Sequence, residues 1–215
     1  MLKNYDAVVL ACFGTGRPAE FEKTFYKIYQ GLVKKLNKPC FLALTSTIFL
    51  KTLNLKLVKD CLNDLKEEGY KDILIVPLIM ADGVEYQRLL KAVDKDMFDR
   101  VDILEPILKQ NRKEIVSLLN GLLIENGERY LLLGHGSKLG HNEDYFDLLK
   151  EMGRGDIKLS FMHDEIDEKD FLVFPLFISR GHHYLEFMEE HPEFRYSDQC
   201  LGEMDELIEI IYKGI

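Results

Sequence analysis

The chain of 215 residues repeats part of its own sequence, and this repeat restricts the folds open to it. Residues 72–86 read DILIVPLIMADGVEY and align without gaps on residues 170–184, which read DFLVFPLFISRGHHY. A shorter similarity precedes each segment in the same order, FGT at 13–15 and HGS at 135–137. The shared proline and the shared Gly-x-x-Tyr beyond the apolar run argue against a chance match between two apolar strands. We therefore interpret the chain as a duplicated unit.

Short apolar runs alternate with amphipathic segments in both halves. Several runs are apolar at every position (AVVLAC, ILIVPLI, FLVFPLF), which is typical of strands buried on both faces of a parallel sheet. The predicted strands are residues 6–12, 40–44, 72–79, 101–104, 129–133, 158–162 and 171–177. Helical spacing of apolar residues predicts helices over 20–36, 56–68, 112–124, 143–152 and 204–212. The alternation predicts an α/β fold of two similar βαβ lobes, each a parallel sheet flanked by helices, related by a pseudo-twofold axis around a central cleft.

The two expected lobes are residues 1–108 and residues 109–215. In open α/β sheets, ligands bind beyond the carboxyl ends of the strands. The segments that follow those ends should therefore line the cleft, and they read FGTGR, MADGVEY, GHGSKLGH, HDE and SRGHHY.

Histidines are concentrated in the strand-end segments of the second half. Five of the six fall there, and only His191 lies elsewhere; the five are His135, His141, His163, His182 and His183. The repeat places Phe13 opposite His135, Val84 opposite His182 and Glu85 opposite His183. Imidazoles on one lobe and a carboxylate on the other suit a divalent ion such as Co, Ni, Fe or Zn.

Composition excludes several other classes of function. Lys+Arg 28 against Asp+Glu 37 gives a net charge of −9, which argues against a nucleic-acid-binding groove. No apolar run reaches the roughly 18–20 residues of a membrane span, and the N-terminus does not read as a signal peptide. Four widely spaced cysteines fit a reducing cytoplasm. The glycine turns FGTG and GHGS match no nucleotide-binding motif, so no nucleotide is expected. A homo-oligomer is compatible with the sequence.

The order and spacing of several short motifs resemble the class II, ATP-independent chelatases, in particular the anaerobic sirohydrochlorin cobaltochelatases. The similarity extends nearly end to end. Its motifs are LACFGT at 10–15, ALTS at 43–46, EGY at 68–70, PL at 77–78 with GVEY at 83–86, GHGS at 134–137, PL at 175–176 with GHH at 181–183, and LGE at 201–203.

The resemblance implies two similar lobes around a tetrapyrrole cleft, and a divalent metal, most simply Co²⁺ but also Ni²⁺ or Fe²⁺, inserted into sirohydrochlorin. The metal-binding histidines of the family fall on His135 and His183, and His163 stands where the family has a third, glutamate ligand. His135, His183 and Glu85 are then the expected catalytic residues. Phe13 is expected to pack on the macrocycle. The cations in the strand-end segments are expected to bind its carboxylates, and they are Arg17, Lys138 and Arg180.

This sequence differs from the family pattern in four places. His163 replaces the glutamate but has Asp164 and Glu165 beside it. Ile79 and Leu139 stand where the family has further histidines. Few residues separate His163 from the next strand, so a helix usual in the family is expected to be missing. These differences keep open a non-catalytic tetrapyrrole or metal carrier on the same fold. The two glycine turns keep open an α/β phosphate-handling enzyme that uses them to bind anions.

Overall fold

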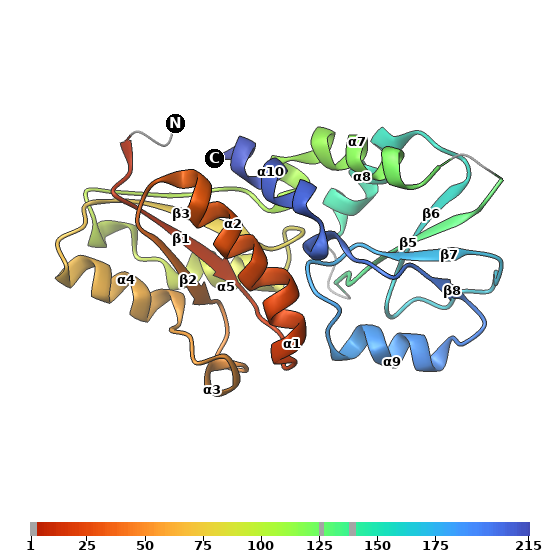
Figure 1. Ribbon diagram of the computed structural model, residues 1–215, viewed down its shortest axis with the longest axis horizontal. Helices are drawn as coiled ribbons and strands as arrows, with labels where there is room; N and C mark the ends of the chain where they lie inside the picture. The colour runs from red at the N-terminus through yellow and green to blue at the C-terminus, as the bar shows by residue number, and fades with distance from the viewer. Residues whose placement is uncertain (1–3, 125–126, 138–140) are drawn as a thin grey trace.

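The computed structural model describes residues 4–124, 127–137 and 141–215 and contains two parallel four-stranded sheets (Figure 1). The first has the order β2-β1-β3-β4 and comprises β1 (Ala7–Cys12), β2 (Cys40–Leu44), β3 (Asp72–Leu78) and β4 (Arg100–Ile103). The second has the order β6-β5-β7-β8 and comprises β5 (Tyr130–Gly134), β6 (Ile157–Phe161), β7 (Leu172–Pro175) and β8 (Arg195–Tyr196). The α/β class and the two lobes are confirmed.

The strand orders also confirm the duplication. Residues 72–86 and 170–184 form β3 and β7 with the segments that follow them, and each strand is the third in its own sheet. Likewise, β1 and β5 each occupy the second position and are followed by the FGT and HGS turns. Equivalent sequence therefore occupies equivalent places in the two sheets.

Helices cover both faces of each sheet. The helical segments of the first half are α1 (Pro18–Phe21), a π-helical turn (Glu22–Tyr26), α2 (Lys27–Leu36), α3 (Leu50–Leu53), α4 (Val58–Glu67), α5 (Val84–Ala92) and a 3₁₀ turn (Lys95–Met97). Those that follow are α6 (Ile107–Gln110), α7 (Arg112–Leu122), α8 (Glu143–Met152), α9 (His182–Glu190), a 3₁₀ turn (Leu201–Glu203) and α10 (Asp205–Gly214).

The strands bury alternate residues in opposite cores, as the fully apolar runs predict. Val8 and Leu10 of β1 belong to a large central core, whereas Ala7 and Val9 belong to a separate core under α4 and α5. In the second sheet, Leu132 points to the central core and its neighbours pack toward α9. The central core contains residues of both lobes.

The C-terminal helix connects the two lobes. α10 contacts α2 of the first lobe and α7 of the second, and Figure 1 shows it between these helices. Lys27 and Lys35 of α2 form ion pairs with Asp205 (2.7 Å) and Glu209 (2.6 Å) of α10. The end of the chain is therefore packed on the first lobe. The division at residues 108/109 stays a prediction.

Several elements differ from the sequence-based expectation, among them the short helices α3 and α6, which were not predicted. Helices α5 and α9 begin directly after Gly83 and Gly181, in segments for which no helix was predicted, and strand β8 was not expected. The expected missing helix is confirmed, because no helix lies between β6 and β7. Within the described residues, no helix is long and apolar enough to cross a membrane.

Candidate metal-binding site

The turns after β1 and β5 present the first pair of candidate residues. Phe13 directly follows β1, and His135 directly follows β5. The next residue is a glycine with positive φ in both cases, Gly14 at 87° and Gly136 at 66°. A Cβ on Gly136 would lie 2.6 Å from atoms of the Phe161 ring, so both the conformation and the space require glycine there. This turn holds His135 at the exposed carboxyl end of its strand.

The second pair of candidate residues lies in the first turns of α5 and α9. Glu85 is the second residue of α5, and His183 is the second residue of α9. The sequence analysis predicted no helix at either position, and this was wrong. Tyr86, Leu89 and Val93 are buried at helical spacing, so the helical period was present in the sequence.

His135 and His183 lie side by side. Their ring centroids are 6.0 Å apart, with an interplanar angle of 69°. His135 Nδ1 lies 3.1 Å from the carbonyl oxygen of Gly136, and His183 Nδ1 lies 3.0 Å from Glu186 Oε2. Carbonyl and ionised carboxylate oxygens only accept hydrogen bonds, so both Nδ1 atoms donate and the Nε2 atoms carry the lone pairs. Neutral imidazoles with one ring nitrogen so anchored are suitable metal ligands.

His163 is not part of this histidine pair in the structure. Its ring stacks on Phe161, with centroids 6.1 Å apart and an interplanar angle of 12°. Asp164 accepts the backbone N–H of Phe161 (2.8 Å), so its carboxylate stabilises the turn after β6. In the described parts of the chain, no three His, Cys, Asp or Glu side chains are arranged to hold a metal ion. The pair His135–His183 is therefore the part of the predicted ligand set that is preassembled.

The two candidate residues of the first lobe, Glu85 and Phe13, are positioned by contacts with other residues of that lobe. Glu85 accepts a hydrogen bond from the Thr45 hydroxyl (3.1 Å) and forms an ion pair with Arg88. The Phe13 ring meets Phe49 edge to face, with centroids 5.4 Å apart. Glu85 is therefore an oriented, partly exposed carboxylate at the end of the first sheet, and Phe13 is a half-buried aromatic ring that directly follows β1.

The three predicted cations have different surroundings. Arg17 is exposed immediately before α1, whereas Lys138 lies outside the described residues, as does Leu139. Arg180 forms an ion pair with Glu203 at 2.8 Å, and the two side chains are 23% and 14% exposed. Glu203 also accepts the backbone N–H of Cys200 (2.9 Å). A substrate carboxylate would have to compete with Glu203 for Arg180.

Segments of the two lobes meet next to the histidine pair. A Cβ placed on Gly181 would lie 4.0 Å from Thr15 Oγ1, so the turn after β1 approaches the start of α9. Lys27 of α2 donates to the carbonyl oxygen of Glu203 (2.6 Å), which ties the first lobe to the segment that holds Arg180. Tyr184, just after His183, is fully buried, and this burial raises the pKa of its phenol above the ordinary value. The start of α9 is thus anchored from inside and from the opposite lobe.

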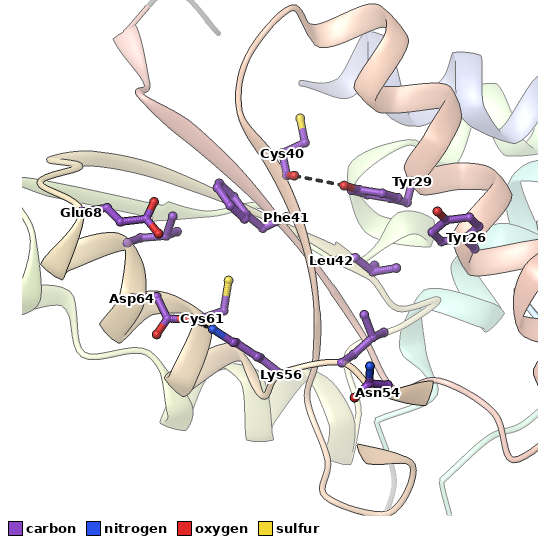
Figure 2. A pocket seen from close by; sticks show the side chains of 12 residues that line it. Tyr26, Tyr29, Cys40, Phe41, Leu42, Asn54, Lys56, Cys61, Asp64 and Glu68 are labelled. Atoms are coloured by element: carbon purple, nitrogen blue, oxygen red, sulfur yellow. Dashed lines mark hydrogen bonds and ion pairs between the residues drawn. The ribbon is translucent and has the colours of Figure 1, made fainter. Parts of the chain in front are cut away.

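A groove of the first lobe lies away from these candidate residues. It has a volume of about 410 Å³ and lies along edge strand β2, with Tyr29 on one side and Lys56, Cys61 and Asp64 on the other (Figure 2). No candidate site residue lines it.

Comparison with known proteins identifies the family. A family model described as cobalt chelatase (CbiK) matches residues 6–163, which include His135 and His163. The chain belongs to the CbiK cobalt chelatase family. Membership of this family makes the protein a metal chelatase, as the resemblance in the sequence implied.

Structural comparison agrees with this family. The sirohydrochlorin chelatase SirB from Bacillus subtilis subspecies spizizenii, solved in complex with cobalt, has 12% sequence identity and a TM-score of 0.72. The match covers 97% of this chain and 93% of that chain, and it shows the fold. A Mycobacterium smegmatis structure in complex with beta-D-fucofuranose has 11% identity, covers 86% of this chain and 68% of that chain, and has a TM-score of only 0.35. No curated protein matches the sequence.

Sequence reasoning missed two features of the candidate site. Glu186 contacts both His182 and His183, and it could have been found from its spacing of four and three residues once α9 was recognised. The ion pair of Arg180 with Glu203 has no local signal, because it depends on how the segment before α10 folds back.

Proposed function

We propose that the protein inserts Co²⁺ into sirohydrochlorin without ATP, in the cytoplasm and as a step of tetrapyrrole and cobalamin biosynthesis. The observation that carries the proposal is the adjacent pair His135 and His183, with rings 6.0 Å apart, in a chain of the CbiK cobalt chelatase family. The proposal follows the SirB relative, whose description names sirohydrochlorin and cobalt. Ni²⁺ and Fe²⁺ are the alternative metals, because imidazole suits all three ions.

The reaction requires proton transfer as well as metal binding. One divalent ion enters the macrocycle while two pyrrole N–H groups lose their protons, so charge is conserved without nucleotide hydrolysis. In our proposal, Nε2 of His135 and Nε2 of His183 hold the ion, which sheds water as it binds. His163 is the proposed third ligand and would have to leave its stacked position on Phe161. A neutral imidazole or the Glu85 carboxylate accepts the released protons.

The remaining candidates would bind the macrocycle. Phe13 offers an aromatic face, since it is half-buried against Phe49 at the end of β1. Arg17 is exposed and is free to reach a substrate carboxylate. Lys138 and Arg180 share this proposed role, Arg180 in competition with Glu203.

An absorbance assay tests the proposal. Sirohydrochlorin is mixed with Co²⁺, Ni²⁺ or Fe²⁺, with and without the protein, and the spectral change of metal insertion is followed. We expect the protein to accelerate insertion, most strongly with Co²⁺, and the variant His183→Ala to lose the acceleration. Binding of sirohydrochlorin without faster insertion would instead identify a carrier, which the differences at Ile79, Leu139 and His163 keep open. If phosphate compounds but not Co²⁺ protect the protein against unfolding, the phosphate-handling enzyme is the better assignment.

A further inference from the structure

The carboxylate of Glu186 lies between the imidazoles of His182 and His183. Its Oε2 is 3.0 Å from His183 Nδ1, and its Oε1 is 3.1 Å from His182 Nε2. All three residues belong to the first two turns of α9, where residues three and four apart are neighbours on the helix surface. One carboxylate thus serves two histidines, of which only His183 has its ring against His135.

The contact determines which nitrogen of His183 faces a ligand. Because an ionised carboxylate only accepts hydrogen bonds, Nδ1 of His183 carries the proton and Nε2 carries the lone pair. His135 has the same arrangement through the carbonyl oxygen of Gly136 (3.1 Å). Neither Nε2 atom forms a hydrogen bond within residues 4–124, 127–137 and 141–215. These contacts favour, in both rings, the tautomer that leaves Nε2 available to bind a metal.

We propose that Glu186 is a positioning residue for the metal site: it holds His183 in the Nδ1–H tautomer and fixes the direction of its Nε2 lone pair toward the ion. This inference rests on the proposed function, because it assumes that His183 binds the metal. A carboxylate behind a metal-ligating histidine orients the ring and raises its basicity, and its loss typically costs about 10–100-fold in metal affinity or activity.

If the role of Glu186 were purely structural, its removal would lower the thermal stability of the protein. The side chains of His183 and Glu186 are 73% and 48% exposed, and an exposed pair of this kind contributes little to folding stability. Removal of Glu186 should therefore leave thermal stability nearly unchanged. A loss of metal affinity without a loss of stability is the signature of positioning.

The test compares Glu186→Ala, Glu186→Gln and the control Glu189→Ala, which changes an exposed glutamate one turn along the same helix. Co²⁺ affinity is measured by titration of the visible absorption of the bound ion. We expect Glu186→Ala to weaken Co²⁺ binding about 10–100-fold, with Glu186→Gln in between, because its amide oxygen still accepts one hydrogen bond. Glu189→Ala should match the wild type.

A second measurement does not depend on metal. Long-range ¹H–¹⁵N correlation spectra of the metal-free protein report the tautomer of each histidine, and we expect Nδ1–H for His183 in the wild type and a shift toward Nε2–H in Glu186→Ala. Unchanged Co²⁺ affinity, or an unchanged tautomer in Glu186→Ala, overturns the positioning role. Failure of the wild type to insert metal into sirohydrochlorin, with Co²⁺ binding still dependent on Glu186, overturns the proposed function and supports the positioning role.

Discussion

The imidazole rings of His135 and His183 meet edge to face, with centroids 6.0 Å apart, although 47 residues lie between them in the chain. His135 directly follows β5, and His183 is the second residue of α9, the helix after β7. These two strands are neighbours in the parallel sheet, so their carboxyl ends bring the two residues together. The equivalent positions of the first lobe hold Phe13 and Glu85, which makes the two halves chemically unequal.

The histidine pair should dominate metal affinity. We expect His135→Ala and His183→Ala each to weaken Co²⁺ binding. The loss should exceed the about 10–100-fold that typically follows removal of a residue that hydrogen-bonds a metal ligand. Each variant should keep the wild-type melting temperature, because both side chains are exposed. Equilibrium titration with Co²⁺ and thermal unfolding measure the two effects.

His191→Ala is the matched control for the pair. Its ring packs against Phe187 (4.5 Å between centroids) and Phe194 (5.7 Å), so its loss should lower stability and leave Co²⁺ affinity unchanged. Loss of Co²⁺ binding in His191→Ala but not in His183→Ala would show that the metal site has been misplaced.

The ion pair of Arg180 and Glu203 should stabilise the fold and the start of α9. Glu203→Ala leaves a guanidinium that is only 23% exposed without its partner, and this should cost about 1–3 kcal/mol in the free energy of unfolding. Chemical denaturation measures the loss. Glu206→Ala, at an exposed position of α10, should have little effect. Equal stability of the two variants would contradict the role given to this pair.

Much of the fold could be predicted because burial on both faces leaves a strong signal. The apolar runs of β1, β3 and β5 mark three central strands, and the shared proline marks β3 and β7 as equivalents. Strand β8 could not be found in this way, because Arg195–Tyr196 is too short to show a pattern. Helices α5 and α9 were missed although their buried residues follow a helical period.

The sequence could predict which candidate site residues lie close together only where neighbouring strands of the sheet bring them together. His135 and His183 meet because β5 and β7 are neighbours in the sheet. The repeat predicts that the two sheets have the same strand order but does not give that order. By contrast, the stacking of His163 on Phe161 and the pairing of Arg180 with Glu203 depend on how turns pack, for which the sequence has no periodic signal. Whether His163 completes a metal site stays a prediction.

The four free cysteines should differ strongly in reactivity. Burial raises the pKa of Cys61 to about 11 and of Cys200 to about 12, and it raises that of Cys12 further, so these thiols stay protonated. Cys40 is less buried and lies in the groove along β2 (Figure 2). We expect Ellman's reagent to modify Cys40 first in the native protein and the others only on unfolding. Cys40→Ser should remove the fast phase, and an unchanged fast phase would contradict this order.

Asp6 should make stability depend on pH. Its carboxylate accepts the backbone N–H groups of Lys71 (2.9 Å) and Asp72 (3.0 Å) at the start of β3, and these bonds lower its pKa below the ordinary 3.8. A carboxyl with a lowered pKa in the folded state adds stability above the unfolded pKa and loses it as pH falls through the folded pKa. The stability difference between wild type and Asp6→Asn should therefore be constant above about pH 5 and shrink below pH 3.8. Denaturation at several pH values measures it, and a difference that grows on acidification would have the wrong sign.

Glu85 should act on proton transfer rather than on metal binding. It lies on the lobe opposite the histidine pair, where Thr45 and Arg88 hold its carboxylate in one orientation. Glu85→Gln keeps an oxygen that can accept from Thr45 but removes the group that can take up a proton. Since general base catalysis contributes typically 10²–10⁴-fold, kcat for metal insertion should fall by about that range while Co²⁺ affinity stays at the wild-type value. The control Thr45→Val removes the hydroxyl that donates to Glu85 and keeps the carboxylate, so its loss of kcat should be smaller. If Glu85→Gln instead weakens Co²⁺ binding in proportion to its loss of rate, Glu85 is a metal ligand and the division of labour between the two lobes proposed above is wrong.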